Sequence, residues 1–216
     1  MFLKPAKEDV MKEKTLFSGN LLKKIIVIVA GSVIAAYGIT LALYAGFGGA
    51  TLAVLWQGIS KTFHISMGMA SFAVAVVMIL FALFYDRKQI HIGTILYQVV
   101  YSVCVDLFAN CHVYSEYLWL NLLIMLLGIV LFAAGTGLYA SASLGRGSYE
   151  ALTFALAEKN NWQVKTVRMV LDALMVIIGV LLGGKFGICT VVTILISGPI
   201  IQFVNSKAKK VLRISP

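Results

Sequence analysis

Residues 25–60 of the chain read IIVIVAGSVIAAYGITLALYAGFGGATLAVLWQGIS and contain no charged side chain over 36 positions. A helix needs about 20 predominantly apolar residues to cross the hydrocarbon core of a bilayer. The stretch therefore predicts one membrane span. A glycine-rich break at residues 46–49 and a short apolar segment at residues 50–60, too short to cross unaided, follow that span.

The rest of the chain has the same character. Of its 216 residues, 60% are hydrophobic and only 12% are charged, whereas soluble domains are about 25% charged. Further apolar runs of spanning length lie at residues 67–85, 90–109, 118–142, 164–182 and 186–204, and a second short segment lies at 148–158. These runs predict an all-α polytopic membrane helix bundle of six transmembrane helices plus two short re-entrant or interfacial helices.

The distribution of positive charge predicts the orientation. Basic loops stay on the cytoplasmic side of a membrane. With six spans, 16 of the 18 basic residues fall on one side, and only Lys61 and Lys185 fall on the other. If both short segments also crossed, Arg87, Lys88 and Arg146 would move to the outside and weaken this asymmetry. We therefore expect a membrane protein whose two termini are cytoplasmic.

The two ends of the chain hold much of the excess positive charge, which totals +9. Residues 1–24 and 205–216 are predicted to be cytoplasmic basic tails. Basic segments next to a membrane are attracted to anionic lipid headgroups. The lipid bilayer, rather than nucleic acid, is therefore the expected partner of this charge.

The chain also contains an internal repeat. The first repeat is residues 25–109 and the second is residues 118–204, and a shift of 97 residues matches their order of a long span, a glycine-rich break, a short helix and two spans. Identical residues then coincide at Gly38/Gly135, Leu41/Leu138, Ala45/Ala142, Gly48/Gly145 and Leu55/Leu152, and a shift of 96 aligns Thr94 with Thr190. Three spans per half is an odd number, so the second repeat is predicted to be inverted. Inverted repeats with interrupted helices are typical of transporters, although duplication could also have produced only a stable bundle.

Charged residues within a membrane span are costly, so they mark candidate functional positions. Asp172 lies near the middle of the run at 164–182, and Arg168 lies one helical turn earlier on the same face. The two could form a structural ion pair, or they could bind a substrate or couple transport to protons. Both interpretations remain open from the sequence.

The second glycine-rich break carries charge, whereas the first does not. Glu150 follows Gly145, Arg146 and Gly147 in the first turn of the short helix. Capping by Ser148, with an acid favoured by the helix dipole, would account for Ser148 and Glu150 without a function. Alternatively, unpaired N–H groups at the two breaks, formed by Gly48, Gly49, Gly145 and Gly147, could bind an anion together with Arg146.

The remaining polar candidates are Asp106, Gln57, Trp56 and Tyr149. Asp106 lies near the outer end of its span and could simply reach the lipid headgroups. Interfacial anchoring is the commoner role of Trp and Tyr, while contact with a ligand is the alternative. The three histidines are expected to be solvated or interfacial. No metal site, cofactor or enzyme is predicted, because no phosphate loop, metal-binding helix or nucleophile motif occurs.

These residues resemble the YczE/YyaS/YitT group of bacterial multi-pass membrane proteins. The resemblance covers residues 27–204 and rests on LGRGSYE at 144–150, GGKFGICT at 183–190, and Gly93, Thr94, Asp106, Arg168, Gly198 and Pro199. Members of the group usually carry a proline, a bulky residue and an aspartate after each break, where this chain has Thr51–Ala53 and Ser148–Glu150. The YitT type usually adds a soluble C-terminal domain, so the YczE-like branch, without that domain, is expected. The resemblance implies the membrane class, a location in the bacterial cytoplasmic (inner) membrane and the repeat, with no assigned substrate.

The sequence therefore predicts a small-molecule transporter or permease that works by inverted repeats and holds an unidentified ligand. The alternative is a non-transporting membrane component, such as a substrate-binding or partner-binding subunit of a larger complex. In that case an ATPase partner or a homo-oligomer would be expected. The residues proposed to contact the ligand are Asp172, Arg168, Glu150, Arg146, Tyr149, Gln57 and Asp106.

Overall fold

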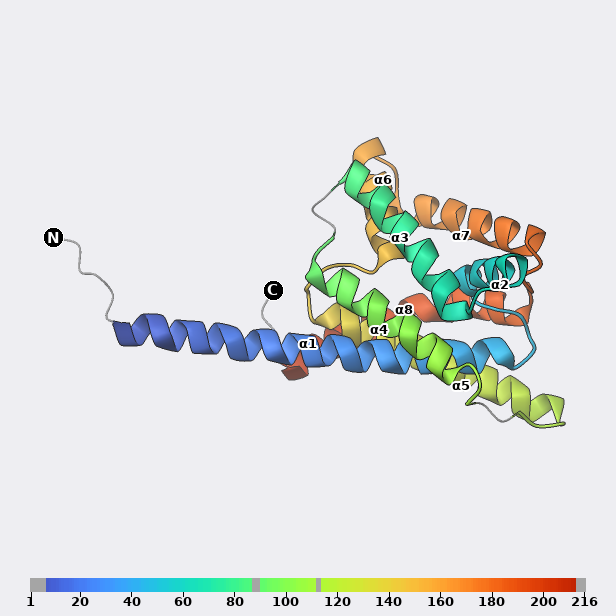
Figure 1. Cartoon of the computed structure of the whole chain (residues 1–216), viewed down its shortest axis with the longest axis horizontal. Coiled ribbons are helices and arrows are strands. Elements are labelled where there is room, and N and C mark those ends of the chain that lie inside the picture. The colour runs from blue at the N-terminus through green and yellow to red at the C-terminus, as the bar shows by residue number, and fades with distance from the viewer. Residues whose placement is uncertain (1–6, 87–89, 112–113, 213–216) are drawn as a thin grey trace.

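The computed structural model describes residues 7–86, 90–111 and 114–212, with side chains from residue 21 onward. Arg87, Lys88 and the outermost residues of both tails lie outside this part of the chain. The described residues form eight α-helices (Figure 1). These are α1 (Lys7–Tyr44), α2 (Thr51–Phe63), α3 (Met67–Tyr85), α4 (Ile92–Phe108), α5 (Leu118–Ser141), α6 (Ser148–Asn160), α7 (Val164–Leu181) and α8 (Ile188–Leu212).

Each apolar run of the sequence forms one helix, which confirms the all-α prediction for the described residues. The first and last helices are longer than their runs, because α1 begins at Lys7 and α8 continues to Leu212. Helices α1, α3, α5 and α8 are long and apolar enough to cross a membrane. Helix α4 has 17 residues, and α7 carries the three charged residues Lys165, Arg168 and Asp172. A helical membrane bundle is therefore shown, and the total of six spans stays a prediction.

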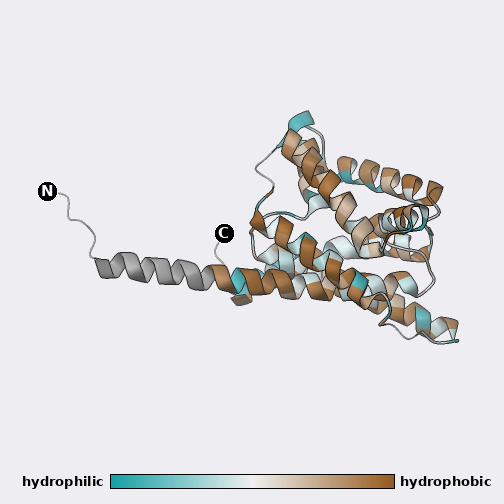
Figure 2. Ribbon diagram, viewed as in Figure 1, coloured by the Kyte–Doolittle hydropathy of each residue, from teal (hydrophilic) through white to brown (hydrophobic). Residues whose placement is uncertain are grey.

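Hydrophobic residues predominate along the helices (Figure 2), and many large apolar side chains are exposed on their outer faces. Phe84 and Leu181 are each 81% exposed, and Leu195 is 68% exposed. Large apolar side chains rarely face water in such numbers on one protein. Their exposure is what a bundle surrounded by lipid requires.

The centre of the bundle is the crossing of α1 and α5, which approach closely at four glycines. A Cβ atom added to Gly31 would lie 2.7 Å from the Gly135 carbonyl oxygen, and one added to Gly38 would lie 2.6 Å from the Gly128 carbonyl oxygen. Small residues at membrane helix interfaces allow the backbones this proximity. Only glycine fits at these positions without moving one helix away from the other.

The other helices flank this crossing in matching pairs. Helix α4 packs on α1 while α8 packs on α5, and α2 packs on α7 while α6 packs on α3. One pairing has no counterpart, because α3 packs on α4 whereas α7 makes almost no contact with α8. The bundle is therefore closed on one flank and open on the other.

The first glycine-rich break, between α1 and α2, is bound to the start of α8. The N–H of Gly49 donates to the Lys185 carbonyl oxygen at 3.1 Å, and the Thr190 hydroxyl donates to the Gly49 carbonyl oxygen at 2.5 Å. Gly48 has a φ of 89° and lies against the backbone of Gly187. A side chain at Gly48 would therefore be both strained and obstructed.

The second break, between α5 and α6, is bound to the start of α4 in the same manner. The N–H of Gly93 donates to the Leu144 carbonyl oxygen at 3.0 Å. The Thr94 hydroxyl donates to the Arg146 carbonyl oxygen at 2.7 Å, and Gly145 has a φ of 121°. Each break is thus fixed by a helix that belongs to the other half of the chain.

Candidate functional site

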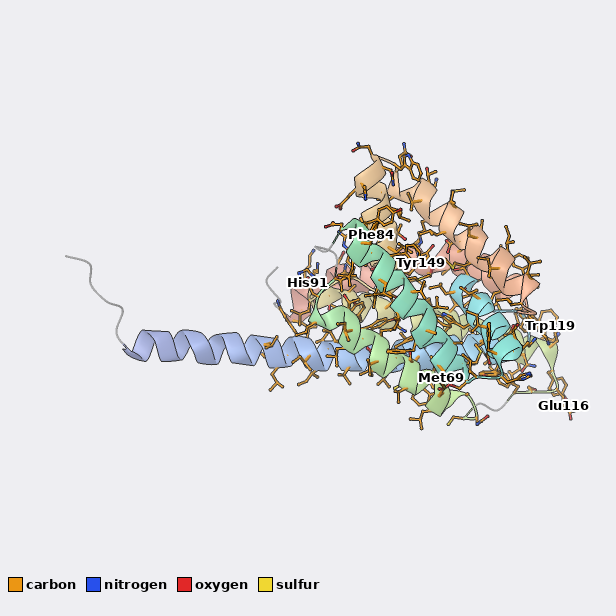
Figure 3. All side chains as sticks on the ribbon, turned by 45° about the horizontal axis from the view of Figure 1, so that its top comes forward. Met69, Phe84, His91, Glu116, Trp119 and Tyr149 are labelled. Carbon is orange, nitrogen blue, oxygen red and sulfur yellow. The ribbon has the colours of Figure 1, made fainter. Side chains whose placement is uncertain are left out.

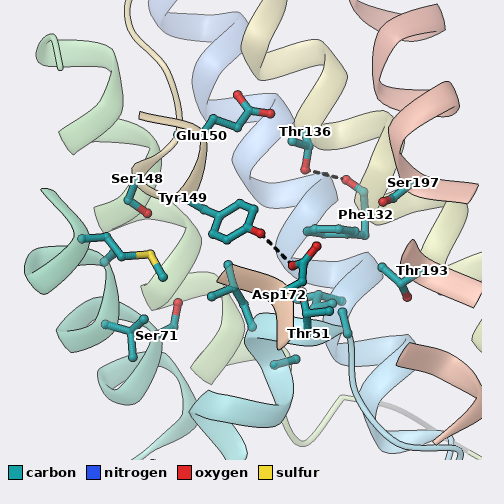
Figure 4. A pocket seen from close by; sticks show the side chains of 18 of the residues that line it. Thr51, Ser71, Phe132, Thr136, Ser148, Tyr149, Glu150, Asp172, Thr193 and Ser197 are labelled. Atoms are coloured by element: carbon teal, nitrogen blue, oxygen red, sulfur yellow. Dashed lines mark hydrogen bonds between the residues drawn. The ribbon is translucent and has the colours of Figure 1, made fainter. Parts of the chain in front are cut away.

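A cavity of about 420 Å³ lies between the two halves of the bundle (Figure 4). All eight helices contribute side chains to it, and most of these side chains are apolar. A volume of this size is within the range of small-molecule sites. Six candidate residues from the sequence line this cavity, namely Trp56, Gly147, Tyr149, Glu150, Arg168 and Asp172.

Tyr149 links the two charged residues of α7 to α6. Its hydroxyl donates to Asp172 Oδ1 at 2.7 Å, and the Arg168 guanidinium lies 5.7 Å from the centre of its ring. Among the described residues, no ion pair joins Arg168 to Asp172. The ion-pair interpretation is therefore wrong, because an aromatic side chain from another helix takes its place, and interfacial anchoring does not describe Tyr149.

Glu150 lies in the first turn of α6, where its side chain is half-buried. Helix α6 is not one of the helices long enough to span. Burial raises the pKa of the Glu150 carboxyl above its usual value, and the positive charges of Arg168 and Arg146 oppose this shift. The protonated form of Glu150 is thus easier to reach than that of an exposed glutamate.

The N-terminus of α6 is not capped as the sequence predicted. The N-cap residue is Gly147, which has no side chain to accept a hydrogen bond. Ser148 is buried, and its hydroxyl donates instead to Gln98 Oε1 at 3.4 Å. Gln98 in turn donates to Ser102 at 2.9 Å and to Ser71 at 3.3 Å, so Ser148 belongs to a buried polar network rather than to a cap.

An aromatic row forms the opposite wall of the cavity. The rings of Tyr139 and Tyr97 stack with centres 4.0 Å apart, Tyr97 stacks on Tyr101 at 5.4 Å, and Trp56 meets Tyr101 edge-on at 5.9 Å. Trp56 is only 7% exposed, so the prediction of an interfacial anchor is wrong. Tyr97 and Tyr101 lie one turn apart on one face of α4. This spacing is visible in the sequence, but a search for charged residues within the spans does not find it.

Two predicted residues lie elsewhere and have structural roles. Asp106 accepts hydrogen bonds from Gly68 N at 2.6 Å and from the Ser66 hydroxyl at 2.5 Å, which fixes the start of α3. Gln57 accepts from Lys185 N at 2.6 Å, next to the first break. Neither lines the cavity. Gly48, Gly49 and Gly145 are also absent from its lining, and they belong to the two glycine-rich breaks.

A second cavity of about 650 Å³ adjoins the first. Its lining includes Arg146 and His91, and it shares Tyr149, Glu150, Arg168 and Ile201 with the first cavity. The Arg146 guanidinium lies 3.4 Å from the centre of the Phe154 ring. Its buried Nη1 atom has no hydrogen-bond partner among the described residues. The four side chains shared by the two linings separate the two cavities. Within the described chain, no group of three residues is arranged to hold a metal ion.

The profile of a protein family matches residues 22–206 of this chain, and the family is described as a family of unknown function (DUF6198). The chain belongs to the DUF6198 family. This DUF6198 chain is 26% identical over 175 residues to the uncharacterized membrane protein YczE of Bacillus subtilis, covering 81% of each chain.

Two further relatives are similar to the DUF6198 chain. An uncharacterized protein of Haemophilus influenzae is 27% identical over 165 residues, which cover 76% of this chain and 74% of the relative. The uncharacterized protein YyaS of Bacillus subtilis is 21% identical over 175 residues, covering 80% and 87% respectively. These relatives confirm the resemblance to the YczE/YyaS group and the multi-pass membrane class. No solved structure matches the chain.

Proposed function

We propose that the protein is a small-molecule permease that works by alternating access between two inverted halves. The observation that carries this proposal is the make-up of the central cavity, which is lined by matching positions of both halves. At the shift of 97 these pairs are Leu52/Tyr149, Ala53/Glu150, Ser71/Arg168 and Ala75/Asp172, and at the shift of 96 they are Tyr97/Thr193 and Tyr101/Ser197. A cavity on the axis between inverted repeats is where transporters of this plan bind substrate.

The packing of the bundle supports the inversion. Gly31 lies against Gly135 and Gly38 against Gly128, and exchanging the halves at a shift of 97 turns one contact into the other. The hydrogen bonds of Thr94 and Thr190 to the opposite breaks are exchanged in the same manner. An inverted repeat of three spans requires that α4 and α7 also cross, which gives six spans.

The charges of the cavity favour a bound polar group. Glu150, Arg168 and Asp172 all come from the second half, while their counterparts Ala53, Ser71 and Ala75 are uncharged. Charged residues at membrane depth are costly and most often serve ion or substrate pathways. We propose that Tyr149, Glu150 and Arg168, which separate the two cavities, form the inner gate of the permease.

The direct test is flux into proteoliposomes that contain the purified protein. The panel contains labelled water-soluble metabolites and labelled amphiphiles, and each is measured with the wild type, Asp172→Asn and Glu116→Gln. We expect flux of at least one compound, a drop of about tenfold in Asp172→Asn, equivalent to about 1.4 kcal/mol, and no change in Glu116→Gln. Glu116 is exposed and lies at the end of the molecule remote from His91 (Figure 3), so it is a matched control for the loss of one acid.

Absence of flux for the whole panel, together with stable co-purification of a partner such as an ATPase, would replace the permease with the subunit interpretation. Topology is tested separately by single cysteines at Lys61 and Lys159. The six-span arrangement requires that an impermeant thiol reagent applied outside reaches only the cysteine at Lys61. Outside labelling at Lys159 would contradict the inversion.

A further inference from the structure

The open flank of the bundle leads directly into the central cavity. Helix α7 makes almost no contact with α8, yet both helices line the cavity, α7 with Met169 and Asp172 and α8 with Thr193, Ile194 and Ser197. Figure 4 shows Thr193 and Ser197 across the pocket from Ser148, with Asp172 between them. The space between α7 and α8 is therefore a side wall that the fold leaves incomplete.

The size of the lining residues gives the physical reason for this opening. The counterparts of Thr193 and Ser197 are Tyr97 and Tyr101, whose buried rings stack on each other and contact Tyr139 and Trp56 at the cavity wall. A threonine and a serine at these two positions of α8 leave empty the volume that two tyrosine rings occupy in the first half. The first half has aromatic side chains at these two positions, and the second half has none.

The edges of the opening face the surroundings of the bundle. Met169 is 63% exposed and Ile194 is 51% exposed, although both line the cavity. Side chains can be exposed and line a cavity only where the cavity meets the outer surface. Both residues lie in the interior of helices that are proposed to span, so this surface is at the depth of the lipid chains.

The interior is equipped for a molecule with an apolar body and a polar end. Trp56 and Tyr101 are 7% and 2% exposed, and Trp56 Nε1 and the Tyr101 hydroxyl have no hydrogen-bond partner among the described residues. Buried polar groups are nearly always paired, so both atoms are available to a ligand. The charged groups from the second half are two acids, Glu150 and Asp172, and two bases, Lys165 and Arg168, which suits a polar end carrying both signs of charge.

We infer that the cavity takes up a single-chain zwitterionic amphiphile laterally from the bilayer, through a portal between α7 and α8 edged by Met169 and Ile194. The inference rests on the proposed function in one respect, because transport of the bound amphiphile requires that the protein is a permease. The portal itself is a property of the binding site. A binding measurement without flux therefore tests it independently.

The experiment uses Trp56 as a reporter inside the cavity. The exposed residues Trp119 and Trp162 are changed to phenylalanine, which leaves Trp56 as the sole tryptophan of the three in the chain. The protein is reconstituted in phosphatidylcholine vesicles and titrated with dodecylphosphocholine brominated in its alkyl chain, because bromine quenches tryptophan on contact. We expect saturable quenching that unbrominated dodecylphosphocholine reverses.

Two matched double variants test the route. Met169→Phe with Ile194→Phe places larger side chains at the edges of the portal and so narrows it. Val170→Phe with Leu195→Phe adds the same rings at exposed neighbours that do not line the cavity. We expect the first pair to raise the half-saturating probe fraction about tenfold and the second pair to leave it unchanged. Circular dichroism and gel filtration show whether both variants remain folded.

Equal quenching in the two double variants, or quenching that rises linearly without saturation, would overturn the portal. Brominated dodecane, which lacks a polar end, is expected to compete poorly, and equal binding of it would overturn recognition of the polar end. Binding through the portal without flux would leave the portal intact and reject the permease. Flux of a water-soluble compound without portal-dependent binding would support the permease and reject the portal.

Discussion

The two halves of the bundle share a plan but differ on one flank and in one set of charges. In the first half α3 packs on α4, and Tyr97 and Tyr101 of α4 stack on each other at the cavity wall. In the second half α7 is separated from α8, and the positions that match these two tyrosines are Thr193 and Ser197. The first half contributes three of the four rings of the aromatic row, Trp56, Tyr97 and Tyr101, and the second half contributes Tyr139 together with the acids and bases.

From this difference we infer that duplication produced the contacts that hold the bundle together, called the frame below, and that later divergence produced the binding site. The parts that hold the frame, the glycine crossing and the two threonine hydrogen bonds, are the same in both halves. The parts that face the cavity are different in each half. Variants of the shared parts are therefore expected to act in matched pairs, and variants of the cavity are not.

The largest expected effect is on the crossing of α1 and α5. A Cβ atom at Gly38 would lie 2.3 Å from Phe132 N, and one at Gly135 would lie 2.4 Å from Ala35 N. Gly38→Leu and Gly135→Leu should each destabilise the bundle by about 3 kcal/mol or more, at the upper end of overpacking. Thermal unfolding in detergent measures this. Gly198→Leu is the control, because nothing lies within 4 Å of its added Cβ, and a similar loss there would remove the packing explanation.

The next effect distinguishes the role of Asp106, in the first half, from the role of Asp172, in the second half. Asp106→Ala removes both acceptors at the start of α3 and should lower the free energy of unfolding by about 1–2 kcal/mol, as loss of a helix cap does, without changing ligand binding. Asp172→Asn should change stability less and binding more. If Asp106→Ala instead impaired binding of the brominated probe at unchanged stability, the assignment of the two acids would be reversed.

The smallest effect tests whether the two halves hold each other equally. Thr94→Val and Thr190→Val each remove one hydrogen bond between halves, and each should cost about 1 kcal/mol. Thr153→Val is the control, because the Thr153 hydroxyl donates to the Tyr149 carbonyl oxygen within its own helix. Urea or thermal unfolding of the three variants gives the comparison. A large difference between Thr94→Val and Thr190→Val would show that the halves are not joined equivalently.

The sequence predicted the helices well, because long uncharged runs in a membrane have few alternatives to helix. It was less informative about side-chain partners. Ser148 fits the pattern of a helix cap, but Gly147 begins the helix and Ser148 reaches Gln98 on α4. Arg168 and Asp172 are correctly spaced for an ion pair, but Tyr149 from α6 takes the bond to Asp172. Local spacing describes one helix, and both outcomes depended on a second helix.

The amino-acid sequence was sufficient to predict the membrane class, the eight helical segments, the glycine-rich breaks and the absence of charge from the first break. All of these follow from composition and short-range pattern. The tertiary structure alone decided the aromatic wall, the exchange of hydrogen bonds between the halves and the opening between α7 and α8. The physical reason is distance along the chain, since the bonds that fix the breaks join residues 52 and 141 positions apart, and only folding brings such residues together.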